Sequence, residues 1–325
     1  MKILLVGGSG YVGSVLTPKL LERGYEVDVV DLLWFGNNLP KSVNVVQKDV
    51  FELTEDEVKK YEQIVFLAGL SNDPMADYSP AQNFIENASS PAYLAYIAKR
   101  AGVKRYIYGS SCSVYGYTVN ELYDEQCPTI SNHPYGISKL QGEFGSLQLQ
   151  DETFSVICFR QGTICGYSPR MRLDLIVNTM FKTAVADCLI TVDNPAIWRP
   201  ILAIQDAASA YIRGIEAPEG ISGVFNICSG NFTVGETADY VKDGVKEYLN
   251  IDAKIQIKHK QDFRNYKVNT EKAQNVLSFK PRFGVKDIVK ELADNIENFN
   301  DFDNERYYNI RTFKKVCSGY KRKSL

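Results

Sequence analysis

Short apolar runs alternate with longer amphipathic runs along the first half of the chain. The short runs are rich in β-branched or aromatic residues, which is typical of strands that are buried on both faces. Glycines follow two of the longer runs, at Gly24 and Gly102, where the C-caps of helices are expected. The predicted strands are 2–6, 26–30, 43–47, 63–67, 105–108 and 154–159, and the predicted helices are 12–23, 54–60, 79–101 and 135–150.

This alternation predicts an α/β fold with a Rossmann-type, doubly wound parallel sheet that helices cover on both faces. Ligands of such sheets bind beyond the carboxyl ends of the strands. After residue 160 the pattern loosens into a smaller, interleaved α+β region. The tail from residue 300 is rich in Asn, Asp, Tyr and Lys, and the basic run at its end, 321–323, is expected to be solvated. In this second half we expect helices at 173–185, 207–217, 234–249, 271–277 and 285–298 and strands at 224–227 and 254–257.

A glycine-rich loop, Gly7-Gly8-Ser9-Gly10-Tyr11-Val12-Gly13, joins the first predicted strand to the first helix. Glycines allow positive φ and bring the backbone close to a pyrophosphate, and the helix N-terminus offers unpaired N–H groups to that anion. Asp31 ends the second strand, where a carboxylate can hydrogen-bond the adenosine ribose and would repel the 2′-phosphate of NADP. The loop and the acid together predict bound NAD. Asp49 and Val50 are expected to flank the adenine, although Asp49 could instead only cap its strand.

A serine cluster, Gly109-Ser110-Ser111-Cys112-Ser113, follows the fifth predicted strand, and Tyr135 and Lys139 come later at the start of a helix. Residues i and i+4 share one helix face, so the tyrosine and the lysine point the same way. A nearby ammonium would lower the pKa of the phenol and let Tyr135 act as a general base, with a serine hydroxyl beside it. The order of the motifs predicts an enzyme, with an NAD-binding domain over 1–160 and a mainly substrate-binding domain over 161–325, of which about 200–230 returns to the first sheet.

The amino-acid composition argues against several kinds of partner, metal site and reaction. Thirty-seven Lys and Arg against 39 Asp and Glu give a net charge of −2, so nucleic acid is not expected as a partner. Two histidines, His133 and His259, exclude a histidine-rich metal site and disfavour a Ser-His-Asp hydrolase. The seven cysteines form no CxxC pair, which is typical of buried thiols in a reducing compartment. The chain enters a strand at once and has no apolar stretch near ~20 residues, so we expect a cytoplasmic protein without membrane segments.

Together these motifs resemble those of the extended short-chain dehydrogenases/reductases, and within them the NAD-dependent nucleotide-sugar epimerase/dehydratase family. The glycine loop resembles the family's Gly-x-x-Gly-x-x-Gly, and the Ser-x-x-Val-Tyr-Gly segment places its catalytic serine at Ser111. The resemblance implies a nucleotide-sugar substrate and a homodimer that pairs through helices. It implies cofactor contacts from the following residues in addition to Asp31, Asp49, Val50, Tyr135 and Lys139: Gly7, Gly10, Tyr11, Val12, Gly13, Leu67, Ala68, Gly69 and Asn87.

The same resemblance implies a set of substrate-binding residues. Arg199 and Arg264 resemble family arginines that bind the diphosphate of the sugar nucleotide, and His259 stands near a position where another arginine is common. The segment 168–174, with Arg170 and Arg172, resembles a subgroup associated with surface-polysaccharide sugars that includes a GDP-heptose 4-dehydrogenase; these two arginines either contact substrate or line a subunit or lid surface. The full expected set is Ser111, Thr163, Arg170, Arg172, Asn178, Arg199, His259 and Arg264.

Departures from the family pattern limit the reaction. The 4,6-dehydratases carry an Asp-Glu pair after the catalytic residue, whereas this chain has Cys112 and Ser113, which disfavours dehydration. We expect hydride transfer at a sugar carbon, most simply the fourth, ending in epimerisation or in net oxidation. The alternatives are a 4,6-dehydratase, a dehydrogenase of a small substrate such as an amino acid, and a non-enzymatic dinucleotide sensor.

Overall fold

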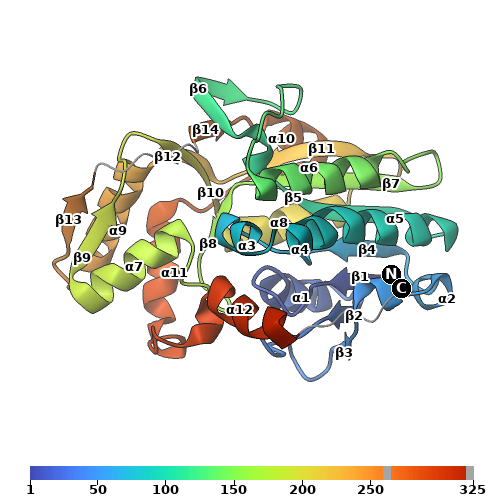
Figure 1. Cartoon of the computed structure of the whole chain (residues 1–325), viewed down its shortest axis with the longest axis horizontal. Helices are drawn as coiled ribbons and strands as arrows, with labels where there is room; N and C mark the ends of the chain where they lie inside the picture. Colours follow the sequence, from blue (N-terminus) through green and yellow to red (C-terminus); the bar gives the residue numbers. More distant parts are fainter. Residues whose placement is uncertain (259–264, 320–325) are drawn as a thin grey trace.

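The structure is a computed structural model that describes residues 1–258 and 265–319. A seven-stranded sheet of order β11-β7-β5-β4-β1-β2-β3 forms the larger part of the molecule, and every neighbouring pair in it is parallel (Figure 1). This is the doubly wound sheet that the sequence predicts. Its strands are β1 (Lys2–Val6), β2 (Glu26–Asp31), β3 (Asn44–Gln47), β4 (Gln63–Phe66), β5 (Arg105–Ser111), β7 (Ser155–Gln161) and β11 (Gly223–Ile227).

Side chains alternate between the two faces of the sheet, and both faces are buried. Leu5 points to the face covered by α1 (Gly13–Glu22) and α8 (Ile204–Ile215), while Leu4 points to the face covered by α5 (Ser90–Arg100). Both leucines are almost fully buried. The strands are therefore continuous apolar runs rather than alternating ones, because helices shield each face from water.

The strand order reverses between β1 and β4, since the chain builds outward from β1 on one side and from β4 on the other. A crevice opens at such a switch point beyond the carboxyl ends of the strands, and ligands bind there. The glycine loop follows β1 at this point, and the loop that begins with Leu67 follows β4. The fold thus places the two cofactor segments predicted from the sequence side by side.

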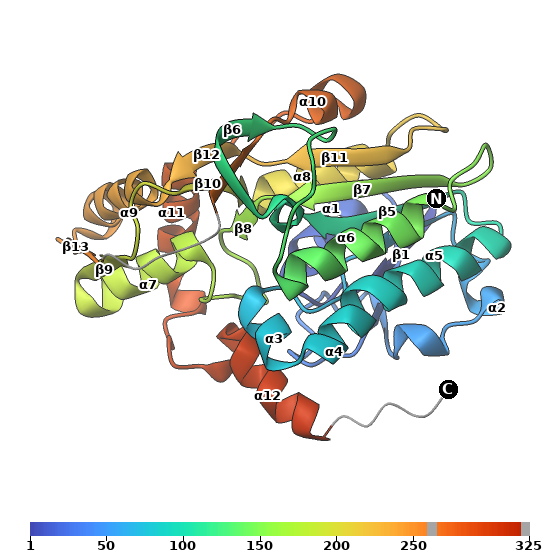
Figure 2. The same cartoon turned by 45° about the horizontal axis from the view of Figure 1, so that its top comes forward.

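A second, smaller core lies beside the sheet (Figure 2). Three helices pack around buried side chains such as Phe181 and Val241: α7 (Ile176–Asp187), α9 (Val234–Leu249) and α11 (Val285–Asp294). Short strands form three small sheets in this part of the molecule. They are β8 (Thr163–Cys165), β10 (Trp198–Ala203) and β12 (Gly230–Thr233) in one sheet, β9 (Leu189–Val192) with β13 (Lys254–Ile257), and β6 (Tyr117–Tyr123) with β14 (Asn265–Val268).

Helix α3 (Asp73–Tyr78) was not expected, the helix expected over 285–298 ends at Asp294, and three larger differences from the expected elements follow. The single helix expected over 79–101 is interrupted by a π-helical turn at Ile85–Ser89, which separates α4 (Pro80–Phe84) from α5. Strands β6, β8, β9, β10, β12 and β14 were not expected, because most are short and carry mixed polar residues. The remaining elements are η1 (Val50–Glu52), α2 (Glu55–Val58), η3 (Cys112–Tyr115), α6 (Pro134–Leu147), α10 (Glu271–Leu277), η4 (Ile296–Asn298), η5 (Glu305–Tyr307) and α12 (Asn309–Gly319).

The third difference is the tail from residue 300, where no helix was expected and α12 forms; the basic run 321–323, expected to be solvated, lies outside the described residues. Helix α12 packs back against α3 and the loop after β2, as Figure 2 shows. Phe313 is buried there with Leu70 and Met75, and Trp34 lies against its ring with 5.7 Å between the ring centroids. The C-terminal part of the described chain therefore covers one side of the crevice at the switch point.

Candidate functional site

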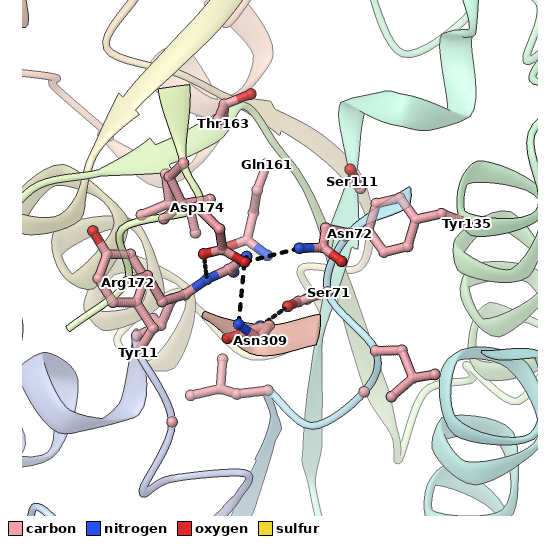
Figure 3. A pocket seen from close by; sticks show the side chains of 18 of the residues that line it. Tyr11, Ser71, Asn72, Ser111, Tyr135, Gln161, Thr163, Arg172, Asp174 and Asn309 are labelled. Atoms are coloured by element: carbon pink, nitrogen blue, oxygen red, sulfur yellow. Dashed lines mark hydrogen bonds and ion pairs between the residues drawn. The ribbon is translucent and has the colours of Figure 1, made fainter. Parts of the chain in front are cut away.

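A cavity of about 730 Å³ lies at the carboxyl ends of the central strands (Figure 3). The glycine loop and the segments after β2, β4 and β5 line it on the side of the large sheet. Residues of β8, of the loop after β9 and of β10 line it on the side of the smaller core, and Asn309 of α12 also reaches it. The cavity therefore joins the predicted cofactor segments to the predicted substrate region.

The glycine loop forms a close-fitting cradle. Gly7 has a φ of +78°, and a Cβ at this position would lie 2.5 Å from the backbone nitrogen of Ala68. A Cβ at Gly13 would collide with the carbonyl oxygen of Gly8, so Gly13 acts in the packing of helix against strand. Gly10 lines the cavity at the start of α1, where backbone N–H groups face outward. The loop fits the diphosphate of a dinucleotide, since only a backbone without side chains can approach the anion so closely.

Asp31 lies at the end of β2 on the wall of the same cavity. Its carboxylate accepts hydrogen bonds from the backbone N–H groups of Ser9 (3.0 Å) and Leu33 (2.8 Å). Burial raises the pKa of Asp31, while these two bonds and the charge of Arg170 oppose the rise. The carboxylate oxygens keep further lone pairs for ribose hydroxyls, so the position suits the role that the sequence predicts.

The other cofactor residues fall into two groups. Tyr11, Val12, Asp49, Val50, Leu67, Ala68 and Gly69 line the cavity. Asp49 also accepts a bond from the Phe51 N–H at 3.0 Å, so it caps η1 as well. Asn87 is a correction: it is fully buried in the π-helical turn and does not line the cavity. Its amide instead donates to the Leu70 carbonyl (2.9 Å), which positions the backbone of the loop that does.

Ser111 and Tyr135 lie on one wall of the cavity (Figure 3). Ser111 ends β5, and Tyr135 stands in the first turn of α6 directly after Pro134. Burial raises the pKa of the Tyr135 phenol, and a hydrogen bond with Ser111 and the charge of Arg172 oppose the rise. The phenol therefore keeps its proton in the protein alone. This corrects the expectation that its pKa is lowered toward neutrality.

Lys139 is buried one helical turn beyond Tyr135. Its ammonium donates to the Gly109 carbonyl at 2.8 Å and lies 5.0 Å from the centre of the Tyr108 ring. Burial lowers the pKa of Lys139 to about 7. The cation that opposes the rise in the pKa of Tyr135 is Arg172, whereas the sequence assigned that effect to Lys139.

Lys139→Met is expected to raise the free energy of unfolding by about 3 kcal/mol at pH 6 and by much less at pH 10. The unfolded chain binds this proton up to a pH of about 10.4, whereas the folded protein releases it near pH 7. Below pH 7 folding therefore includes the cost of burying a charge, and between pH 7 and 10 the wild type gains stability. Urea unfolding at several pH values measures the difference. Lys104→Met, at an exposed site, is the control, and a Lys139→Met difference independent of pH would be contrary evidence.

A buried polar network closes the cavity opposite Tyr135 (Figure 3). Arg172 forms a two-point ion pair with Asp174, with Nε–Oδ1 and Nη2–Oδ2 distances of 2.9 and 3.1 Å. The same carboxylate accepts from the Asn72 amide (3.0 Å) and from the backbone N–H of Asn309 (3.4 Å). This network fixes the Arg172 guanidinium at the cavity wall, within electrostatic reach of Tyr135.

Only some of the predicted substrate-binding residues line the cavity. Thr163 and Arg199 line the cavity on the side of the smaller core, together with Tyr266. Asn178 is a correction, because it is fully buried and does not line the cavity. Its amide donates to the Tyr11 hydroxyl and to the carbonyls of Gly166 and Arg172, so its role is structural. The expectations for His259 and Arg264 concern positions outside the described residues.

Several cavity residues were not among those predicted from the sequence. Asn72 and Asp73 follow the predicted cofactor segment 67–69, and Asp174 ends the segment 168–174, but no motif identified these three residues themselves. Asn309 belongs to a tail in which no helix was expected. Among residues 1–258 and 265–319, no group of three His, Cys, Asp or Glu side chains could bind a metal ion. The same residues contain no helix that is long and apolar enough to span a bilayer.

The sequence model of the family described as "NAD dependent epimerase/dehydratase family" matches residues 3–228. The chain belongs to this family. It is therefore an NAD-dependent enzyme of the nucleotide-sugar epimerase/dehydratase type, and the prediction of NAD as the cofactor is confirmed. The finer resemblance to a GDP-heptose dehydrogenase subgroup is not established by this match.

The relatives are distant but extend over most of the chain. A UDP-glucose 4-epimerase from Corynebacterium glutamicum is 25% identical over 304 residues, which is 86% of this chain and 91% of the relative. The solved structure of MoeE5 in complex with UDP-glucuronic acid and NAD has a TM-score of 0.80 at 22% identity and covers 91% of this chain and 99% of its own. That of TunA, an NAD-dependent NDP-hexosamine 5,6-dehydratase, has a TM-score of 0.80 at 20% identity and covers 91% and 97%. The Rossmann-type fold is thereby confirmed.

Proposed function

We propose that the enzyme transfers hydride at carbon 4 of a nucleotide-activated sugar, with Tyr135, Ser111 and Lys139 as the catalytic residues. The proposal rests on one observation above all. The Ser111 hydroxyl and the Tyr135 phenol lie together on one wall of a cavity that runs from the glycine loop to Arg199 (Figure 3). A sugar hydroxyl between these two groups can lose or gain a proton while its carbon faces the cofactor segments.

Each residue has a separate part in the proposed step. After the phenol has released its own proton, the Tyr135 oxygen takes the proton from the sugar hydroxyl, and the Ser111 hydroxyl donates a hydrogen bond to the same sugar oxygen. The Arg172 charge favours this deprotonated phenol. Lys139 adds to the effect when it is protonated, below a pH of about 7. NAD, when bound, accepts the hydride from the sugar carbon and returns it. Arg199 suits the diphosphate of the sugar nucleotide, because a guanidinium binds phosphate oxygens at two points.

Epimerisation of a UDP-sugar is the outcome that we favour. The relative from Corynebacterium glutamicum bears the name UDP-glucose 4-epimerase, and MoeE5 was solved with UDP-glucuronic acid. These names favour UDP over the GDP that the subgroup resemblance suggested. Net oxidation uses the same three residues and is the second outcome. A role in surface-polysaccharide precursor synthesis follows only from the resemblance of segment 168–174.

Dehydration is less well supported by the site. Cys112, one of the two residues that replace the acid–base pair of the 4,6-dehydratases, is fully buried and does not line the cavity. Its Sγ–H donates to the Arg160 carbonyl, and burial raises its pKa well above the usual range. Ser113 lines the cavity but is no strong acid or base. Elimination of water would therefore need another proton donor.

The function can be tested by incubating the enzyme and NAD with UDP-, GDP- and dTDP-sugars in parallel. NMR of the sugar reports its stereochemistry at carbon 4, and absorbance reports reduced cofactor. The expected result is a new epimer of a UDP-sugar with no net reduction of NAD. Net reduction would identify a dehydrogenase instead, and loss of water a dehydratase. No cofactor-dependent change in any sugar nucleotide would refute the proposal.

The family resemblance also leads us to propose a homodimer through α5 and α6. Phe144 on α6 is 58% exposed and Tyr96 on α5 is 48% exposed, and these two helices pack side by side on one face of the sheet. Large exposed aromatic side chains on adjacent helices are typical of an interface. The second copy of this chain would cover them. The mass of the protein in solution tests this proposal, and a monomeric mass would contradict it.

A further inference from the structure

Arg170 is a buried cation that forms no ion pair with a carboxylate in residues 1–258 and 265–319. Only 4% of the residue is exposed, yet it lines the cavity. Its guanidinium donates to the Asn309 side-chain oxygen (2.5 Å) and the Met171 carbonyl (3.3 Å), and it stacks 3.6 Å from the centre of the Phe35 ring. Asp174, the nearby acid, is paired with Arg172 instead. Burying a charge without a counter-charge is costly, so an anion is needed to balance it.

One hydrogen-bond donor of this guanidinium is unused. Its Nε–H is buried and has no hydrogen-bond partner among the described residues. Burial and the adjacent Arg172 cation lower the pKa of Arg170, whereas the charges of Asp174 and Asp31 raise it. The missing partner is thus an acceptor with negative charge. A phosphate group supplies both, and a guanidinium binds it at two points.

The surroundings of Arg170 identify which phosphate this is. Its backbone N–H donates to the Ser168 hydroxyl, which in turn donates to the carbonyl of Tyr11 in the glycine loop (2.8 Å). Its guanidinium stacks on Phe35, in the loop just beyond Asp31. Arg170 therefore lies between the phosphate cradle and the ribose acid of the cofactor site. Arg199, in contrast, lies on β10 beside Tyr266 and suits the sugar nucleotide.

Helix α12 fixes the position of this arginine. Asn309 is the first residue of this helix. Its side chain accepts a hydrogen bond from Arg170 and donates one (2.6 Å) to the hydroxyl of Ser71, which follows β4. Arg306, just before the helix, donates to the Phe35 carbonyl. The C-terminal segment thus binds both loops that border the cofactor crevice, one after β2 and one after β4.

We propose that Arg170, positioned by Asn309 of α12, binds the diphosphate of the dinucleotide cofactor and completes its site from the C-terminal side of the chain. This proposal rests on the NAD dependence of the family and not on the identity of the sugar. It changes the expectation for Arg170, which was a substrate residue or a residue of a subunit or lid surface. Asn309 is a positioning residue, because it acts through Arg170.

The proposal can be tested by calorimetry on cofactor-free protein with NAD, ADP-ribose and adenosine, in the absence of any sugar nucleotide. Arg170→Met is expected to weaken binding of NAD and ADP-ribose about 10- to 100-fold, since a charge-assisted contact is lost. Adenosine binding should change less than about threefold, because adenosine has no phosphate. Arg105→Met is the matched control: Arg105 is equally buried, but it donates to carbonyls such as Ala217 at the opposite end of the sheet.

Two results would overturn the proposal. Unchanged binding of NAD and ADP-ribose is one, and equal weakening of all three ligands is the other, since it would mean that Arg170 acts only by packing on Phe35. If Arg170→Met does not fold, the same ligands measured on Asn309→Ala decide the question. That variant is expected to weaken the two diphosphate ligands about fivefold and to leave adenosine unchanged. Because sugar turnover is not measured, the outcome is independent of the proposed reaction.

Discussion

Tyr135→Phe is expected to lower turnover of the sugar nucleotide about 1,000-fold while leaving the affinity for NAD almost unchanged. The substitution removes only the phenolic oxygen, which is the group that exchanges a proton with the sugar. The ring remains at the start of α6 and keeps its packing. Turnover is measured as conversion of the sugar at saturating substrate, and NAD affinity by calorimetry.

Tyr240→Phe is the control for this prediction. Tyr240 lies on α9, is 36% exposed and does not line the cavity, so losing its hydroxyl should leave turnover unchanged. A Tyr135→Phe enzyme that kept a tenth or more of the wild-type rate would rule out the phenol as the group that transfers the proton. The site would then need another acid–base residue, and the carboxylate of Asp73 on the cavity wall would be the first to examine.

Glu143→Leu is expected to lower the free energy of unfolding by about 3–5 kcal/mol. Glu143 on α6 is fully buried and forms a two-point ion pair with Arg160 of β7, with distances of 2.6 and 3.0 Å. It also accepts from the Ser110 hydroxyl (2.9 Å) next to the catalytic serine. Removing the carboxylate would leave the Arg160 charge buried and unbalanced. Urea unfolding measures the loss.

The double variant Glu143→Leu/Arg160→Met shows how much of the loss in the free energy of unfolding comes from the unpaired Arg160 charge rather than from the lost ion pair. Replacing both partners with apolar residues of similar volume removes the unbalanced charge, so much of the stability should return. If the double variant is less stable than Glu143→Leu alone, Arg160 stabilises the fold through contacts other than the ion pair, such as its hydrogen bond to the Tyr115 hydroxyl (2.9 Å). In both cases the pair fixes α6, and with it Tyr135 and Lys139, against β5 and β7.

The parts of the site that could be predicted from the sequence are those encoded locally. The glycine loop needs one strand, one turn and one helix, and Tyr135 and Lys139 need only a helix to share a face. Asp31 and Ser111 end strands of one parallel sheet, so the fold alone brings them to one edge. These residues line a common cavity, and this could be predicted without knowing any contact between distant segments.

The parts that could not be predicted depend on contacts between distant segments. Asn309 bonds to Ser71, which is 238 residues earlier, and no local pattern encodes such a pair. The helix itself did carry a signal, because Ile310, Phe313 and Cys317 recur at helical spacing and lie on its packed face. The polar character of the surrounding tail hid this pattern. The pKa of Tyr135 was also missed, because the depth of burial is a property of the folded chain.

Helix α12 has a consequence for how the enzyme acquires its activity during synthesis. Ribosomes add about 5–20 residues per second, and N-terminal segments fold first. The glycine loop and Asp31 emerge early, whereas Asn309 emerges more than 200 residues after Ser71, its partner across the crevice. A nascent chain with a completed sheet would therefore still lack the contact that fixes Arg170. Full affinity for NAD is therefore expected only after α12 has been synthesised, so that NAD binding by a nascent chain would show that translation has passed residue 309.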